Sequence, residues 1–269
     1  MSLSGMRLRV LSAIVLAAPA LLTVYVGPPA FDIVFGLVAL VMVLEWDRLC
    51  GAQRRDVATW ILGASVLTVV VLSLAGRHSA ALWSTPAGFA ALYLVARGID
   101  RKAPLLEACG ALYIGIPVVA LLWLRHDPVH GMVTIFWLLA VVWATDTGAL
   151  FAGRAIGGPK LAPSISPNKT WSGFLGGLAV AGIVSVIAAL WYGAAAVLPI
   201  VLTGVALSVV SQLGDLLESR VKRYLDVKDS GSIIPGHGGL FDRVDGLLAA
   251  APALAAVYLA IGGGSVLWR

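Results

Sequence analysis

The most informative part of the chain is an apolar run at residues 108–124, ACGALYIGIPVVALLWL, which contains no charged side chain. A helix needs roughly 20 such residues to cross a hydrocarbon layer about 30 Å thick, or somewhat fewer when its ends snorkel. A barrel strand would instead alternate apolar and polar residues. The run therefore predicts a transmembrane α-helix.

Similar runs recur along the chain of 269 residues. We expect an all-α, polytopic membrane protein with about nine transmembrane helices. The second run is short and has Asp32 at its start, so a hairpin or re-entrant pair is the alternative for two of the spans. The runs lie at residues 10–26, 31–44, 58–75, 80–96, 108–124, 129–151, 174–192, 194–213 and 247–268.

Composition supports this fold class. The chain is 59% hydrophobic and 12% charged, whereas a soluble domain is about half apolar and roughly a quarter charged. A soluble enzyme and a disordered chain are therefore improbable. Two cysteines, Cys50 and Cys109, provide no disulfide framework.

The basic residues predict the orientation. When the 19 lysines and arginines are assigned to the loops between nine spans, only Arg77, Arg125 and Arg269 fall on the side away from the amino terminus. Positive charge stays on the cytoplasmic side during insertion, so we expect a cytoplasmic amino terminus and an outer carboxyl terminus in the inner (plasma) membrane. The net charge of +5 then reflects topology and attraction to anionic lipid, and does not indicate nucleic-acid binding.

Two inferred cytoplasmic loops, 153–173 and 211–246, hold most polar residues of the second half. We therefore divide the chain into amino-terminal scaffold helices, 1–130, and a catalytic region, 131–269. Asp146 lies within an apolar run, just before the first loop. It faces a wet cavity, a cation or a partner, or it is simply solvated at the end of its helix. Residues 164–173, SISPNKTWSG, suit a phosphate cradle before a helix, although an ordinary basic loop has the same composition.

The second loop concentrates carboxylates among bases. Asp215, Glu218, Ser219 and Lys222 recur at three- and four-residue steps and share one helix face. Two carboxylates stand near the start of the last span, where the helix dipole favours negative charge. They could also hold a cation. Alternatively, they serve only as helix-start residues. Carboxylates beside bases suit a complex of a metal with nucleotide phosphates. The five carboxylates are Asp146, Asp215, Glu218, Asp242 and Asp245.

These segments resemble a known family. SRVKR at 219–223, KDSG at 228–231 and PGHGGLFDRVD at 235–245 are similar to the signature of the phosphatidate cytidylyltransferases, or CDP-diacylglycerol synthases. SPNKTWSG at 166–173 looks like a second element of that family, and Asp146-Thr147-Gly148 like a third. The sequence departs from the family at Ser172, where many members carry Glu, so we assign no carboxylate role there.

The resemblance implies an enzyme that transfers a cytidylyl group from CTP to phosphatidate, giving CDP-diacylglycerol and pyrophosphate. It also implies Mg²⁺, with K⁺ associated with the paired aspartates, and a homodimer. By position, Asp215 and Asp242 would be the metal ligands. The implied catalytic residues are Asp215, Asp242, Lys222, Arg223, Asp245 and Asp146, with Glu218 as an auxiliary group. The implied nucleotide- and phosphate-binding residues are Lys169, Ser166, Lys228, Asp229, His237, Gly238, Gly239 and Arg243.

Two other functions fit the same residues. A secondary transporter also combines many spans with intramembrane carboxylates and glycine-broken helices. A related nucleotidyl- or phosphotransferase would act on another lipid phosphate. Because the polar groups gather on one side of the membrane, the pattern favours an interfacial enzyme.

Overall fold

A computed structural model describes residues 17–51, 56–231 and 238–269, and 79% of these described residues are helical. Among the described residues, seven helices, α3 to α9, are long and apolar enough to cross a membrane. A shorter apolar helix, Ala17–Val26, lies in the first expected span. The elements are α2 (Ala30–Leu49), α3 (Val57–Leu74), α4 (His78–Gly98), α5 (Pro104–Arg125), α6 (Gly131–Ile156), β1 (Lys160–Ala162), β2 (Ser166–Thr170), α7 (Trp171–Tyr192), α8 (Val197–Tyr224), α9 (Phe241–Ile261) and α10 (Gly264–Leu267).

A short hairpin of two strands is an addition to the mostly helical fold that the sequence predicts. β1 and β2 form a two-stranded antiparallel hairpin in which Lys160 is opposite Thr170 and Ala162 is opposite Ser166. Pairing the strands satisfies backbone N–H and C=O groups that a short loop would otherwise leave to solvent. The segment has no long alternating apolar pattern, so its strand character was not visible in the sequence.

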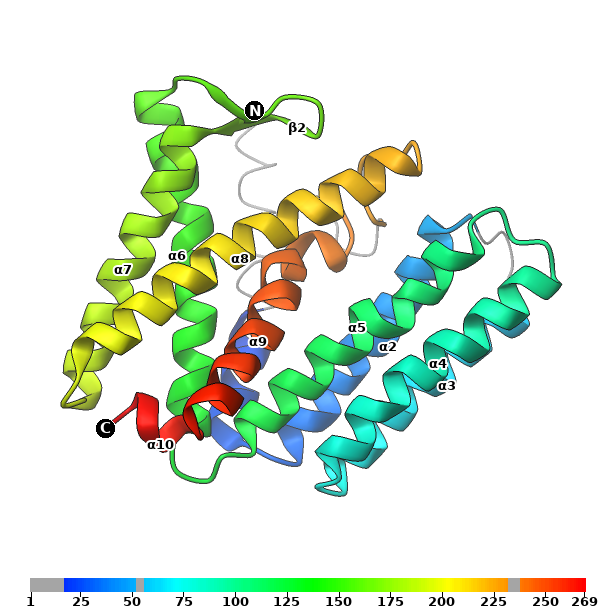
Figure 1. Cartoon of the computed structure of the whole chain (residues 1–269), viewed down its shortest axis with the longest axis horizontal. Coiled ribbons are helices and arrows are strands. Elements are labelled where there is room, and N and C mark those ends of the chain that lie inside the picture. The colour runs from blue at the N-terminus through cyan, green and yellow to red at the C-terminus, as the bar shows by residue number, and fades with distance from the viewer. Residues whose placement is uncertain (1–16, 52–55, 232–237) are drawn as a thin grey trace. The chain divides into compact units, whose positions relative to one another are not determined.

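The chain forms two compact units. The first contains residues 1–126 and 225–244, and the second contains 127–224 and 245–269. In the first unit α2, α3, α4 and α5 lie side by side (Figure 1). In the second, α6 packs against α7, and both contact α8. The division by role at residue 130 stays a prediction.

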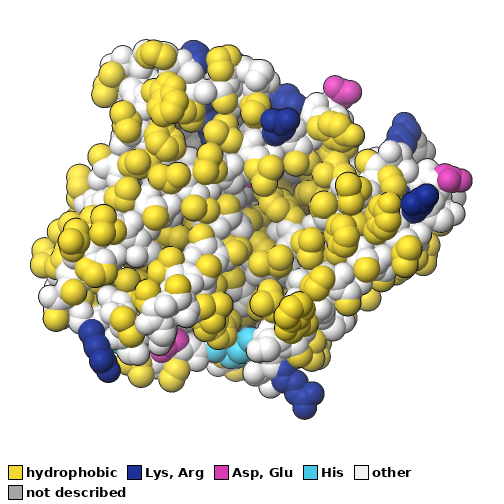
Figure 2. All heavy atoms as spheres, in the orientation of Figure 1, with side chains coloured by type: hydrophobic (Ala, Val, Ile, Leu, Met, Phe, Trp, Pro, Cys, Tyr) yellow, Lys and Arg dark blue, Asp and Glu magenta, His cyan; other side chains and the backbone are white. Residues whose placement is uncertain are grey.

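The outward-facing side chains are those of a protein surrounded by lipid. Hydrophobic side chains cover most of the face shown in Figure 2, and charged side chains are sparse on it. Trp83 on α4, Trp191 on α7 and Leu259 on α9 are 75%, 85% and 71% exposed. Water would solvate such surfaces poorly, whereas acyl chains match them, so these helices fit a multi-pass membrane protein.

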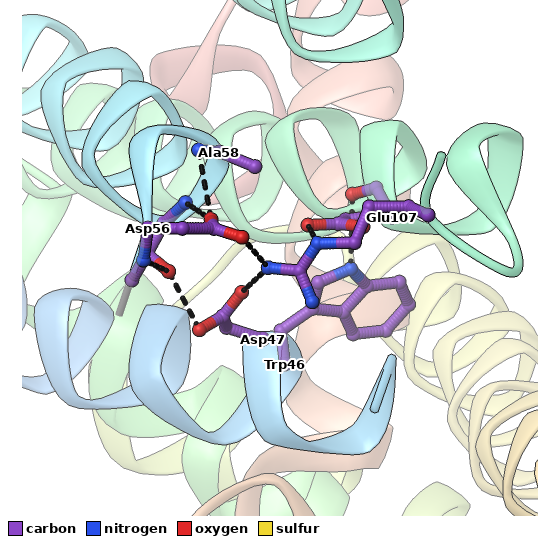
Figure 3. A network of polar contacts seen from close by, with 7 residues as sticks. Trp46, Asp47, Asp56, Ala58 and Glu107 are labelled. Carbon is purple, nitrogen blue, oxygen red and sulfur yellow. Dashed lines mark hydrogen bonds and ion pairs between the residues drawn. The ribbon is translucent and has the colours of Figure 1, made fainter. Parts of the chain in front are cut away.

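A partly buried polar network joins three helix ends in the first unit (Figure 3). The Arg101 guanidinium lies 2.8 Å from Asp56, 3.4 Å from Asp47 and 3.5 Å from Glu107. The Trp46 indole N–H donates to the Glu107 carbonyl oxygen at 3.1 Å. The end of α2 is thereby tied to the starts of α3 and α5.

Candidate functional site

The first group of predicted site residues lies in the second unit, around α8. The Lys169 ammonium on β2 is 2.5 Å from Asp215 Oδ2, and the Ser219 hydroxyl donates to Asp215 Oδ1 at 3.3 Å. One turn further along, Lys222 Nζ is 3.1 Å from Glu218 Oε1. Helical spacing therefore accounts for the pair of Glu218 with Lys222, whereas the lysine that pairs with Asp215 comes from β2.

Glycines bring a further carboxylate to this face. A β-carbon added to Gly214 on α8 would lie 2.5 Å from the Ala249 side chain and 3.1 Å from the Asp245 carbonyl oxygen on α9. Because no side chain separates the helices at this point, Asp245 comes within electrostatic range of Asp215, Glu218 and Asp146. We call Asp146, Lys169, Asp215, Glu218, Lys222 and Asp245 the α8 cluster.

The start of α7 positions Lys169. Thr170 is the N-cap of α7, and its hydroxyl accepts from the Gly173 N–H at 3.1 Å. The Ser172 hydroxyl donates to the Gly157 carbonyl at the end of α6, at 2.5 Å. Ser172 therefore joins two helix ends and contributes no charge. Ser166 lies at the opposite end of β2 from Lys169.

The second group of predicted site residues surrounds Asp242 in the first unit. Asp242 Oδ2 accepts from the Ser230 N–H at 3.1 Å, the Ser230 hydroxyl at 2.9 Å and the Gly239 N–H at 2.8 Å. Gly238 has φ +81°, and a β-carbon there would lie 2.7 Å from the same oxygen. Several donors converging on one oxygen fix the orientation of the carboxylate.

Sequence reasoning gave no site role to Ser230, and it missed Glu45 on α2 altogether. Its side chain is fully buried and accepts from the Leu240 N–H at 2.8 Å and the Phe241 N–H at 2.9 Å. The available signal was an acidic residue directly after an apolar run. The sequence could not show which backbone groups would bind Glu45, because every residue except proline has an N–H.

Most of the chain is similar to known proteins. A sequence model described as the cytidylyltransferase family matches residues 7–261. The chain belongs to the cytidylyltransferase family. A phosphatidate cytidylyltransferase of Brucella suis is 41% identical over 254 residues, which cover 94% of this chain and 93% of the relative. One from Haemophilus influenzae is 35% identical over 93% of this chain and 97% of its own, and one from Bacillus subtilis is 45% identical over 54% of each.

Other predicted residues of this cytidylyltransferase lie at the surface or beyond the described part. Arg223, Lys228, Asp229 and Arg243 are exposed, and their roles at the site stay a prediction. His237 lies outside the described residues. The family membership favours the enzyme interpretation over the transporter interpretation.

The donor chemistry of the cytidylyltransferase suits a hard cation, because its candidate ligands are carboxylate oxygens. Within residues 17–51, 56–231 and 238–269, no group of three or more Asp, Glu, His or Cys side chains is arranged around one metal position. Asp215 and Asp242, the two expected ligands, belong to different units and are held by Lys169 and by the Ser230 and Gly239 donors. In the α8 cluster, Lys169 and Lys222 are each paired with a carboxylate.

Proposed function

We propose that this member of the family is a phosphatidate cytidylyltransferase, which transfers a cytidylyl group from CTP to phosphatidate and releases pyrophosphate. The observation that carries the proposal is the 41% identity to the Brucella suis enzyme over 94% of this chain. The membrane-type helices agree with a lipid substrate.

The chemistry needs charge stabilisation more than a strong base. A phosphomonoester has a second pKa of about 6, so the phosphate of phosphatidate is mostly a dianion at neutral pH. Its oxygen bonds to the α-phosphorus of CTP while the bond from that phosphorus to the bridging oxygen breaks, and the electron pair leaves with pyrophosphate. Lys169 and Lys222 are placed to neutralise these phosphates.

We assign Mg²⁺, with K⁺ as an additional cation, to carboxylates of this enzyme, and keep Asp215 and Asp242 as the ligands to test. Mg²⁺ bound to such oxygens would offset charge developing on the leaving pyrophosphate. Lys169 holds Asp215 in the structure, so a phosphate group that attracts Lys169 would also release an oxygen of Asp215.

We further propose nine spans, a cytoplasmic amino terminus, an outer carboxyl terminus and a site on the cytoplasmic face of the inner membrane. Alternate helices support this orientation, because α2, α4, α6 and α8 each have basic residues in the last turn. If successive spans alternate in direction, as the proposed topology requires, these four ends would share one side of the membrane. A homodimer is proposed from the family resemblance.

The test uses purified protein in mixed micelles with CTP labelled at the α-phosphate, Mg²⁺ and phosphatidate. The expected result is one labelled lipid per pyrophosphate released. Diacylglycerol, which lacks the phosphate, is the matched control and should remain unlabelled. Labelling of a polyprenyl phosphate in place of phosphatidate, or no labelled lipid at all, would overturn the proposal.

A further inference from the structure

Glu45 forms an unusual connection between distant parts of the first unit. Its carboxylate comes from α2 and is 0% exposed, yet both of its oxygens accept backbone N–H groups at the start of α9, 195 and 196 residues further along the chain. The first N–H groups of a helix have no partner within the helix, and the helix dipole favours negative charge there. Glu45 thus caps α9 from another helix.

The same carboxylate adjoins both backbone segments that reach Asp242. A β-carbon on Gly231 would lie 3.0 Å from Glu45 Oε1, and one on Gly239 would lie 2.9 Å from it. Gly231 follows Ser230, and both Ser230 and Gly239 donate to Asp242 Oδ2. Glu45 is therefore in direct contact with the backbone that supplies the hydrogen bonds to Asp242.

Aromatic packing holds the same turn in place. The Phe241 ring is stacked with Tyr113 on α5 at 5.9 Å, and lies 5.7 Å from the Trp46 ring on α2. Phe241 is 1% exposed. Aromatic packing limits the position of this turn. The two hydrogen bonds to Glu45 fix the directions in which the N–H groups of the turn point. A rotation of this turn would move the Asp242 side chain that follows it.

We propose that Glu45 is a positioning residue for cytidylyl transfer, which acts by holding the first turn of α9 so that Asp242 keeps its orientation. The inference rests on the proposed function. Glu45 touches no substrate; it acts through Asp242. Replacing it with glutamine keeps the size of the side chain but removes the charge and one of the two acceptors.

The matched control is Asp32→Asn. Asp32 is a fully buried carboxylate on the same helix, and its partner is the His126 ring at 2.7 Å. Both substitutions neutralise a buried acid on α2, but only Glu45→Gln affects the start of α9. We expect Glu45→Gln to lower kcat by about 10- to 100-fold with little change in KM for CTP, as for other residues that orient ligands. Asp32→Asn should keep kcat within about twofold of wild type, because distant sites act independently.

Two further measurements separate positioning from general stability. Amide hydrogen exchange at residues 240–241 should be faster in Glu45→Gln and unchanged in Asp32→Asn. Ser230→Ala removes one donor to Asp242, so combining it with Glu45→Gln should lower kcat by less than the product of the two single effects, since both act on the same side chain.

Each outcome decides the inference. Wild-type kcat in Glu45→Gln, equal loss in Asp32→Asn, or fully multiplicative effects with Ser230→Ala would overturn it. If Glu45→Gln does not fold, Glu45→Asp keeps the charge but shortens the reach, and is judged by the same kcat and exchange measurements with a smaller expected loss. If the proposed function itself is wrong, the wild-type protein will form no labelled lipid from CTP and phosphatidate. That result differs from each of the outcomes that would overturn the role of Glu45.

Discussion

Replacing Gly214 with alanine should disturb the site through helix packing alone. The new β-carbon would lie 2.5 Å from the Ala249 side chain and 3.1 Å from the Asp245 carbonyl. Ordinary carbon contacts are about 3.5–4.0 Å, so α8 and α9 must separate locally by about 1 Å. Overpacking of this kind destabilises by about 1–3 kcal/mol. A displacement of about 1 Å at a catalytic group can lower the rate by about 100-fold.

The assay for Gly214→Ala combines the thermal midpoint in detergent with kcat/KM for labelled-lipid formation. Gly182→Ala is the matched control, because its β-carbon would meet only Val205 at 3.5 Å, an ordinary contact. We expect a lower midpoint and about 100-fold lower kcat/KM in Gly214→Ala, with both quantities close to wild type in Gly182→Ala. Wild-type kcat/KM in Gly214→Ala would refute the reasoning that close helix contact positions Asp215 and Asp245.

Three further predictions concern single side chains. Asp215→Asn and Asp242→Asn should each abolish turnover while the thermal midpoint stays near wild type; full CTP-dependent activity in either would contradict the cation-ligand assignment. Ser172→Ala should lower stability by about 1 kcal/mol through loss of the hydrogen bond to the Gly157 carbonyl, with near-normal turnover in the lipid assay, and a large loss of kcat would show a catalytic role instead. Burial raises the pKa of the Cys50 thiol from 9.0 to about 12, so its contribution to stability is complete below pH 9 and is lost as the pH rises toward 12. Iodoacetamide at pH 8 should therefore label Cys50 only after unfolding, as measured by mass spectrometry, and rapid labelling of the folded protein would contradict the burial.

The helices were predictable because the signal is local. An apolar run such as 108–124 must leave water wherever the rest of the chain lies, and α5 covers it. The shared face of Asp215, Glu218 and Lys222 was also predictable, since helix geometry alone aligns residues three and four apart. The hairpin carrying Lys169 was not predictable, because its short strands are defined by backbone pairing.

Taken alone, the sequence determined the membrane-type fold, the family and the residue types available for phosphate chemistry. Hydropathy, helical spacing and motif order depend only on neighbours along the chain. Tertiary structure alone decided that Lys169 meets Asp215, that Gly214 permits Asp245 to approach, and that Glu45 caps the helix beginning beside Asp242. These contacts join residues far apart in sequence through backbone groups and close helix packing, and such partners have no distinctive pattern in the chain.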